Sequence, residues 1–251
     1  MTEDPFGEQP IAPAALPEQP HRWRGRDITF FTLGFFLLFV LLNVVVIGLV
    51  NFIPFRGESA DALRALSGTL FVEVTLIGLI AAVIRFVYRL RFFEEMRWRR
   101  DYEMSNVSLL VKGAALAFSV MLVSAMFPPS SPPIERLLST PQAVIAFAIF
   151  GIGFAPFLEE MMFRGFLFRM LEEIAGSSIA VRTTAVLFAL LHVPQLWGSR
   201  AGMLVIFAVG YVLSDLRERT GSMIPPVIVH TAYNGMLFLA FALSTLAQES
   251  A

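Results

Sequence analysis

Long apolar runs alternate with short polar breaks along most of the chain. A helix needs roughly 20 apolar residues to cross a hydrocarbon layer of about 30 Å. Seven segments reach or approach this length: residues 28–53, 69–90, 107–127, 142–171, 178–194, 201–216 and 223–247. Pro, Gly and Ser mark the breaks, as in "PPSSPP" at 128–133 and "RTGS" at 219–222. The pattern predicts an all-α, polytopic transmembrane helical bundle of about seven spans, with an eighth helix possible.

The first 27 residues differ from the rest of the chain. Five prolines and four acidic residues precede residue 21, and little of this segment is apolar enough to enter a core. We therefore expect a disordered cytoplasmic tail over 1–27 and a membrane domain over 28–251.

Composition supports a membrane protein and excludes several classes of function. Hydrophobic residues make up 56% of the 251 residues, Phe occurs 25 times, and the mean hydropathy is +0.69. The net charge of −1 gives no reason to expect nucleic acid as a partner. The chain has no cysteine, so disulfides, thiolate metal sites and thiol nucleophiles are excluded.

Arginines lie mainly in alternate breaks, which predicts the orientation of the spans. They are dense before the first span, after the second, between the fourth and fifth, and after the sixth, and sparse in the other breaks. Because basic residues favour the cytoplasmic side, we expect a cytoplasmic N-terminus and a C-terminus on the other side. The basic and aromatic stretch Arg91–Met104 is expected to lie along the cytoplasmic interface with Trp98 at headgroup depth.

The fourth span contains charged residues within the apolar run "FAPFLEEMMFRGFLF". Glu159 and Glu160 are about 100° apart around a helix, so both should not point into one small site. Arg164 follows Glu160 by one helical turn, a spacing that favours an ion pair. Glu159 is left without a local partner, and an unpaired charge at the bilayer centre costs roughly 3 kcal/mol or more. Such a residue is a candidate for function.

Two of the three histidines also lie in spans. His192 ends "FALLH" in the fifth span, and His230 and Asn234 are one turn apart in "HTAYN" of the seventh. Glu159 and His192 each lie roughly 25 Å along their helices from the turn between the fourth and fifth spans. We therefore expect Glu159, His192, His230 and Asn234 to meet in an intramembrane cavity that opens to the cytoplasm.

This set of side chains suits the attack of water on a carbonyl group. A Glu in a partly dry cavity can act as a general base, and a neighbouring His can orient the water or carry its proton. His and Asn side chains can donate hydrogen bonds to a developing oxyanion.

The three patterns together resemble the motifs of one family. "EEMMFR" is similar to the EExxxR signature of the CAAX-processing endoproteases and bacteriocin-processing enzymes (the CPBP or Abi family of intramembrane proteases), and "FALLH" and "HTAYN" are similar to its FxxxH and HxxxN motifs. The resemblance implies a catalytic core over about 140–245. It implies that Glu159 and His192 activate water, and that His230 and Asn234 form an oxyanion hole. Three further residues would support the site: Glu160, Arg164 and Phe188.

The resemblance also implies an intramembrane peptidase, expected in a bacterial cytoplasmic membrane, which cleaves a peptide or protein substrate with or without an attached lipid. A metal-free glutamate mechanism is favoured, because the chain lacks the HExxH helix of many zinc peptidases. The alternative is Zn²⁺ or another divalent metal bound by Glu159, His192 and His230.

Two functions from other classes remain open. The chain could be a non-proteolytic scaffold or immunity protein of the same fold. It could also be a proton-coupled transporter in which Glu73 and Asn43 begin a relay, although both residues are more simply read as interfacial or packing groups. Asp215 is expected to form a structural ion pair.

Overall fold

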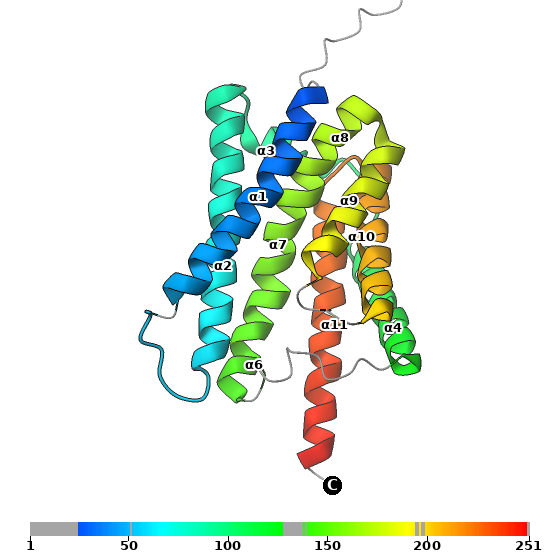
Figure 1. The fold of residues 1–251 in the computed structure, drawn as a ribbon. Helices are drawn as coiled ribbons and strands as arrows, with labels where there is room; N and C mark the ends of the chain where they lie inside the picture. The colour runs from blue at the N-terminus through cyan, green and yellow to red at the C-terminus, as the bar shows by residue number, and fades with distance from the viewer. Residues whose placement is uncertain are drawn as a thin grey trace, which may run out of the picture.

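The computed structural model describes residues 25–50, 52–127, 138, 140–193, 196 and 199–249, and these form an all-helical bundle (Figure 1). The helices are α1 (Gly25–Val50), α2 (Ala60–Ala82, extended by a π-helical turn at Val83–Val87), α3 (Phe92–Glu95), α4 (Asn106–Met126), α6 (Pro141–Ala148), α7 (Ala155–Glu160), α8 (Phe168–Ala175), α9 (Ser177–Leu191), α10 (Arg200–Thr220) and α11 (Ile224–Glu249). α6, α7 and α8 form one continuous helix, joined by π-helical turns at Ile149–Phe154 and Met161–Leu167. The described residues thus contain eight continuous helices, which confirms the predicted fold class.

Five of these helices, rather than seven, are long and apolar enough to cross a membrane. They are Leu33–Val50, Ala60–Val87, Asn106–Met126, Pro141–Ala175 and Ile224–Thr245. α9 has 15 residues and would be about 22 Å long, which is shorter than the hydrocarbon layer. α10 has 21 residues, but its last turn carries Arg217 and Arg219. The prediction of seven spans is therefore corrected to five by length and composition.

The helices run alternately up and down in Figure 1, and α1 begins at the end of the bundle opposite to that where α11 stops. α9 descends only part of the way before α10 returns, so this pair ends short of the far end of α11. If α9 and α10 are not counted as spans, the seven predicted crossings become five, which is also an odd number. An odd number of crossings places the two termini on opposite sides of the membrane. The predicted sidedness of the two termini is therefore the same for five spans as for seven, and it stays a prediction.

Local sequence explains where several helices begin and end. The Ser105, Thr140 and Ser199 hydroxyls cap α4, α6 and α10 by accepting hydrogen bonds from main-chain N–H groups three residues ahead. Thr140 is followed by Pro141, which suits the first turn of a helix. α10 ends at Gly221, whose φ of 61° lies in the left-handed region that glycine adopts without strain.

The stretch Arg91–Met104 is packed into the bundle instead of lying flat. Met96 is fully buried, and the Trp98 ring meets the Phe157 ring edge-on with 5.6 Å between centroids. The Arg97 carbonyl also accepts a hydrogen bond of 3.1 Å from the Met223 N–H group at the start of the last helix. This stretch therefore braces α7 and α11. Its depth in a membrane stays a prediction.

The predicted tail over residues 1–27 lies outside the described residues, except for its last three residues, which begin α1.

Candidate active site

The long helix α6–α8 carries Glu159 and Glu160 at its α-helical centre, between the two π-helical turns. A π-helical turn takes more residues than an α-helical one and so rotates the side chains that follow it. Pro156 lies just after the first π-helical turn and has no N–H group to continue the hydrogen-bond ladder. These local features set the direction in which the two acids leave the helix.

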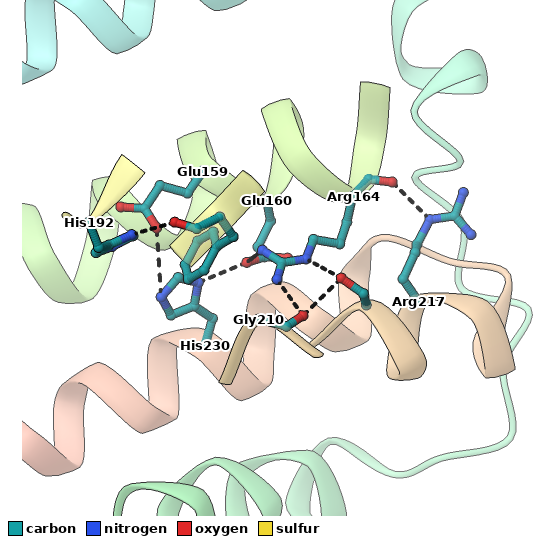
Figure 2. A network of polar contacts seen from close by, with 9 residues as sticks. Glu159, Glu160, Arg164, His192, Gly210, Arg217 and His230 are labelled. Carbon is teal, nitrogen blue, oxygen red and sulfur yellow. Dashed lines mark hydrogen bonds and ion pairs between the residues drawn. The ribbon is translucent and has the colours of Figure 1, made fainter. Parts of the chain in front are cut away.

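Glu160 and Arg164 form the ion pair that their spacing predicted. The Arg164 Nη1 atom lies 2.9 Å from Glu160 Oε1, and both side chains are completely buried. Arg164 Nη2 donates to the Gly210 carbonyl over 2.8 Å, and its Nε donates to the Ser214 hydroxyl over 3.2 Å. Each nitrogen of this buried guanidinium therefore has an acceptor, and the pair is tied to α10 (Figure 2).

Gly210 allows α10 to approach α9 closely enough for this contact. A Cβ atom at Gly210 would lie 3.1 Å from the Phe188 ring and 3.3 Å from the Ala185 main chain. Sequence reasoning missed Gly210 and Ser214. A signal was present, because two small residues one turn apart mark a face of a helix that packs closely.

His230 lies between the two glutamates. Its Nδ1 atom is 2.8 Å from Glu160 Oε1, and its Nε2 atom is 3.9 Å from Glu159 Oε2. The expectation that the two acids could not address one small site is therefore wrong. The two nitrogens of an imidazole lie on different edges of the ring, so one histidine can meet two side chains that leave a helix in different directions (Figure 2).

Glu159 is held far less tightly than Glu160. Its side chain is 19% exposed, and its nearest ionic contact is the 3.9 Å approach of His230. None of the hydrogen bonds found among the described residues involves the Glu159 carboxylate. The acid predicted to lack a local partner on its helix thus has no hydrogen bond in the described part of the chain, and its role in binding another molecule stays a prediction.

His192 follows the last residue of α9, where helical carbonyls lose their partners. Its main-chain N–H group donates to the Ala189 carbonyl over 3.0 Å, which leaves the Phe188 carbonyl to its own ring nitrogen Nδ1 at 2.8 Å. A carbonyl can only accept, so Nδ1 carries the proton and Nε2 presents a lone pair. The Phe188 ring packs against His192 and His230, with centroids 4.6 and 6.0 Å apart.

Asn234 is fixed by the π-helical turn of the long helix. In that turn the Ala155 N–H group bonds to the Phe150 carbonyl, five residues back. In the same register the Gly151 carbonyl would need an N–H group from Pro156, which has none. Asn234 Nδ2 donates to this carbonyl over 2.6 Å. One proton of the amide group is thus committed to the protein, and the second remains for a ligand.

Among models of protein families, residues 140–236 match the family described as type II CAAX prenyl endopeptidase Rce1-like. This Rce1-like segment is similar to that family. The finding confirms the resemblance to the CAAX-processing endoproteases. Neither the curated proteins nor the solved structures gave a match.

The Rce1-like segment contains every residue predicted for the site, and the structure joins most of them by contacts. Glu159, Glu160, Arg164, Phe188, His192 and His230 form one chain of contacts. Asn234 lies one turn after His230 and contacts the opposite helix at Gly151. The contacts leave the catalytic roles of these residues as predictions.

Arg217 is a further buried residue of this segment that the sequence did not single out. Its Nε atom donates to the Arg164 carbonyl over 3.1 Å, and its guanidinium lies over the Phe168 ring at 5.2 Å. Burial lowers the pKa of Arg217 to about 10, so it remains a cation at neutral pH. It stabilises the helix that carries both glutamates.

The polar residues outside the three motifs differ in whether they have local partners. Asn43 donates to the Phe39 carbonyl of its own helix over 2.8 Å, and Asp215 pairs with Arg219 over 2.7 Å. The expected structural pairing of Asp215 is confirmed. Glu73 differs, because it is buried and interacts electrostatically with Glu159.

The residues named for a divalent metal do not form a ligand group in this arrangement. Both histidines direct an unbonded Nε2 away from a hydrogen-bonded Nδ1, as metal-binding histidines often do. However, no three His, Asp or Glu side chains come together as possible ligands within the part of the chain that is described. The preference for a metal-free mechanism stays a prediction.

Proposed function

We propose that this chain is an intramembrane endopeptidase that hydrolyses a peptide bond in a protein or peptide presented at the membrane. Its substrate would be of the CAAX type, or a leader or bacteriocin-type peptide. The Rce1-like match supports a CAAX-type endopeptidase at the level of the family. The observation that carries the proposal is the contrast between two adjacent acids, one locked by Arg164 and His230 and the other without a hydrogen bond.

Glu159 is the base in this mechanism. Its carboxylate accepts a proton from a water molecule as that water attacks the scissile carbonyl carbon. The lone pair on His192 Nε2 accepts a hydrogen bond from the same water and orients it. Because the Phe188 carbonyl fixes the ring through Nδ1, His192 keeps this tautomer without a carboxylate partner.

His230 and Asn234 stabilise the oxyanion that develops on the scissile carbonyl. The second amide proton of Asn234 is available for this bond. His230 donates its Nδ1 proton to Glu160, so Nε2 can donate to an oxyanion only when the ring is protonated. The buried Glu160 carboxylate fixes the ring through Nδ1, which gives Glu160 a role in positioning as well as in stability.

The test is cleavage of a prenylated CAAX-type peptide with a fluorophore and a quencher on either side of the scissile bond, by the purified chain in lipid nanodiscs. Glu159→Gln and His192→Ala should each lower kcat by about two to four orders of magnitude, because the first removes the base and the second removes the group that orients the water. Their melting temperatures should stay near that of the wild type. Asp61→Asn is the matched control, since Asp61 is an exposed acid.

Full activity of both variants would contradict the assigned base and its partner. A well-folded wild-type protein that cleaves neither this peptide nor leader-type peptides would instead favour the scaffold or immunity function. Elemental analysis of active protein decides between the catalytic types, since stoichiometric metal that is required for activity would replace the glutamate mechanism.

A further inference from the structure

One buried acid near the candidate site lies outside the three motifs. Glu73 is in the middle of α2 and is only 6% exposed. Its Oε2 atom is buried without a hydrogen-bond partner in the described part of the chain. Leaving a buried polar group unpaired costs about 1–3 kcal/mol. An acid that a membrane helix keeps at this cost is a candidate for function.

Glu73 and Glu159 occupy similar depths in the bundle. α2 and α6 start side by side, because the Ser59 and Thr140 hydroxyls are 2.7 Å apart, and both helices then rise in the same direction (Figure 1). At 1.5 Å per residue Glu73 lies about 21 Å beyond Ser59, and Glu159 lies about 28 Å beyond Thr140. The π-helical turn at Ile149–Phe154 makes the distance from Thr140 to Glu159 shorter than this value, which brings the two depths closer together.

The face of α2 that carries Glu73 is turned toward the helix of Glu159. Its neighbours Val72 and Leu76 belong to the same buried cluster as Met161 and Met162, which directly follow Glu160. α2 packs against α7, and Glu159 is the ionisable group that interacts electrostatically with Glu73. The two carboxyl groups therefore lie on helices that pack against one another, at similar depths and within range of an electrostatic interaction.

Two carboxyl groups that interact electrostatically in a poorly solvated site are disfavoured from ionising together, because their charges repel. The favoured state holds one proton on the pair, as in the carboxyl dyad of aspartic proteases. Glu160 is not the second carboxyl group of the pair, because Arg164 and His230 already bind its carboxylate. Glu73 is buried without an ion pair among the described residues, whereas Glu159 is partly exposed and approached by His230. The proton therefore belongs on Glu73.

We propose that Glu73 is a further catalytic residue, the neutral partner of Glu159 in a two-carboxyl pair that holds the attacking water and protonates the leaving nitrogen. The inference rests on the proposed peptidase function and deepens it. It brings α2, a helix outside the Rce1-like segment, into the active site. It also gives the buried Oε2 atom of Glu73 a hydrogen-bond partner, which the described part of the chain does not provide.

The proton balance of the reaction is then complete. Water forms the new C–O bond and gives one proton to the Glu159 carboxylate, while the carbonyl oxygen becomes the oxyanion held by His230 and Asn234. The C–N bond breaks as the Glu73 carboxyl group gives its proton to the departing nitrogen. The products are a carboxylic acid and an amine. Glu159 then returns the proton it gained to Glu73, which restores the starting state.

Two substitutions at this position separate catalysis from folding. Glu73→Gln keeps the shape and a hydrogen-bond donor but cannot transfer a proton. Glu73→Leu removes the unpaired polar atom from the interior. Both should lower kcat for the quenched prenylated peptide by about two to four orders of magnitude, with KM changed only a few-fold. Glu73→Leu should melt no lower than the wild type, because it removes a desolvated carboxyl group.

Asp61→Asn provides the control, because it makes the same acid-to-amide change in the first turn of α2 at an exposed ion pair. It should retain wild-type kcat. Wild-type turnover by Glu73→Leu, while Glu159→Gln is inactive, would overturn the role of Glu73 and leave the peptidase proposal standing. Wild-type turnover by both variants would overturn the peptidase proposal at this site.

A second measurement does not depend on the substrate. The carbonyl stretch of a protonated carboxyl group should appear in the infrared spectrum of the wild-type protein at neutral pH. It should disappear in Glu73→Gln and Glu73→Leu and persist in Asp61→Asn. A wild-type spectrum without this band, or one that Glu73→Gln leaves unchanged, would overturn the shared proton even if the wild-type enzyme cleaves peptides normally.

Discussion

The two sides of the candidate site differ in how their polar groups are bound, although they start from adjacent residues. On the inner side, Glu160 is buried between Arg164 and His230, and Arg164 continues the contacts to α10. On the open side, Glu159 and the Nε2 atom of His192 have no hydrogen bond among the described residues, and Glu73 has an unpaired oxygen. The inner side supplies rigidity and charge, and the open side retains the groups that can react.

The largest expected effect comes from a substitution on the inner side of the site, where Arg164 pairs with Glu160. Arg164→Leu leaves the Glu160 carboxylate in the interior without its cation, and should reduce the free energy of unfolding by about 3–5 kcal/mol. Denaturation in detergent, followed by circular dichroism, measures this loss. Glu160→Gln combined with Arg164→Leu should recover most of it, because no uncompensated charge remains and Gln can still accept from His230. A double variant as unstable as the single one would show that the ion pair itself holds the helices together.

Asn234 belongs to both sides, and its substitution should affect activity more than stability. Asn234→Ala removes a donor to the oxyanion and should lower kcat about 10²–10³-fold. It also leaves the Gly151 carbonyl without its side-chain donor, at a cost of about 1–3 kcal/mol if no water enters. Single-turnover rates and melting curves separate the two effects. An unchanged kcat would confine Asn234 to bracing the π-helical turn.

Gly210 tests whether the inner side depends on close packing of α9 and α10. Gly210→Ala places a Cβ atom 3.1 Å from the Phe188 ring and 3.3 Å from the Ala185 main chain. We expect a loss of about 1–3 kcal/mol in stability from overpacking. Activity should also fall, because Phe188 contacts both histidines. Gly78→Ala is the control, since nothing lies within 4 Å of a Cβ atom there.

Asp215 should show the smallest effect, because its ion pair with Arg219 belongs to neither side of the site. The Arg219 side chain is 73% exposed, and exposed pairs contribute about 0.2–1 kcal/mol. Asp215→Asn should therefore leave peptide cleavage at the wild-type level and lower the melting temperature little. A strong loss of activity would place Asp215 among the residues that support the catalytic network.

The sequence predicted much of the candidate site because helical spacing is regular. The four-residue separations place Arg164 beside Glu160 and His192 beside the Phe188 carbonyl, and both contacts need only one helix. The expectation that these residues meet agrees with the structure for Glu159 and His230, which approach to 3.9 Å. Contacts between different helices were harder to predict from the sequence. The small-residue spacing of Gly210 and Ser214 indicates a closely packed face but not the helix that it contacts, and nothing in α2 reveals that Glu73 interacts with Glu159.

The sequence by itself determined the helical bundle, the apolar spans and the residue types available for chemistry, because hydropathy and periodicity depend on neighbours along the chain. Only the tertiary structure decided that α9 and α10 form a short returning pair, and that one imidazole meets both glutamates. It also decided which acid is locked and which is left free. These outcomes depend on how separate helices pack and on which buried polar groups find partners, and partner choice is a property of the assembled bundle.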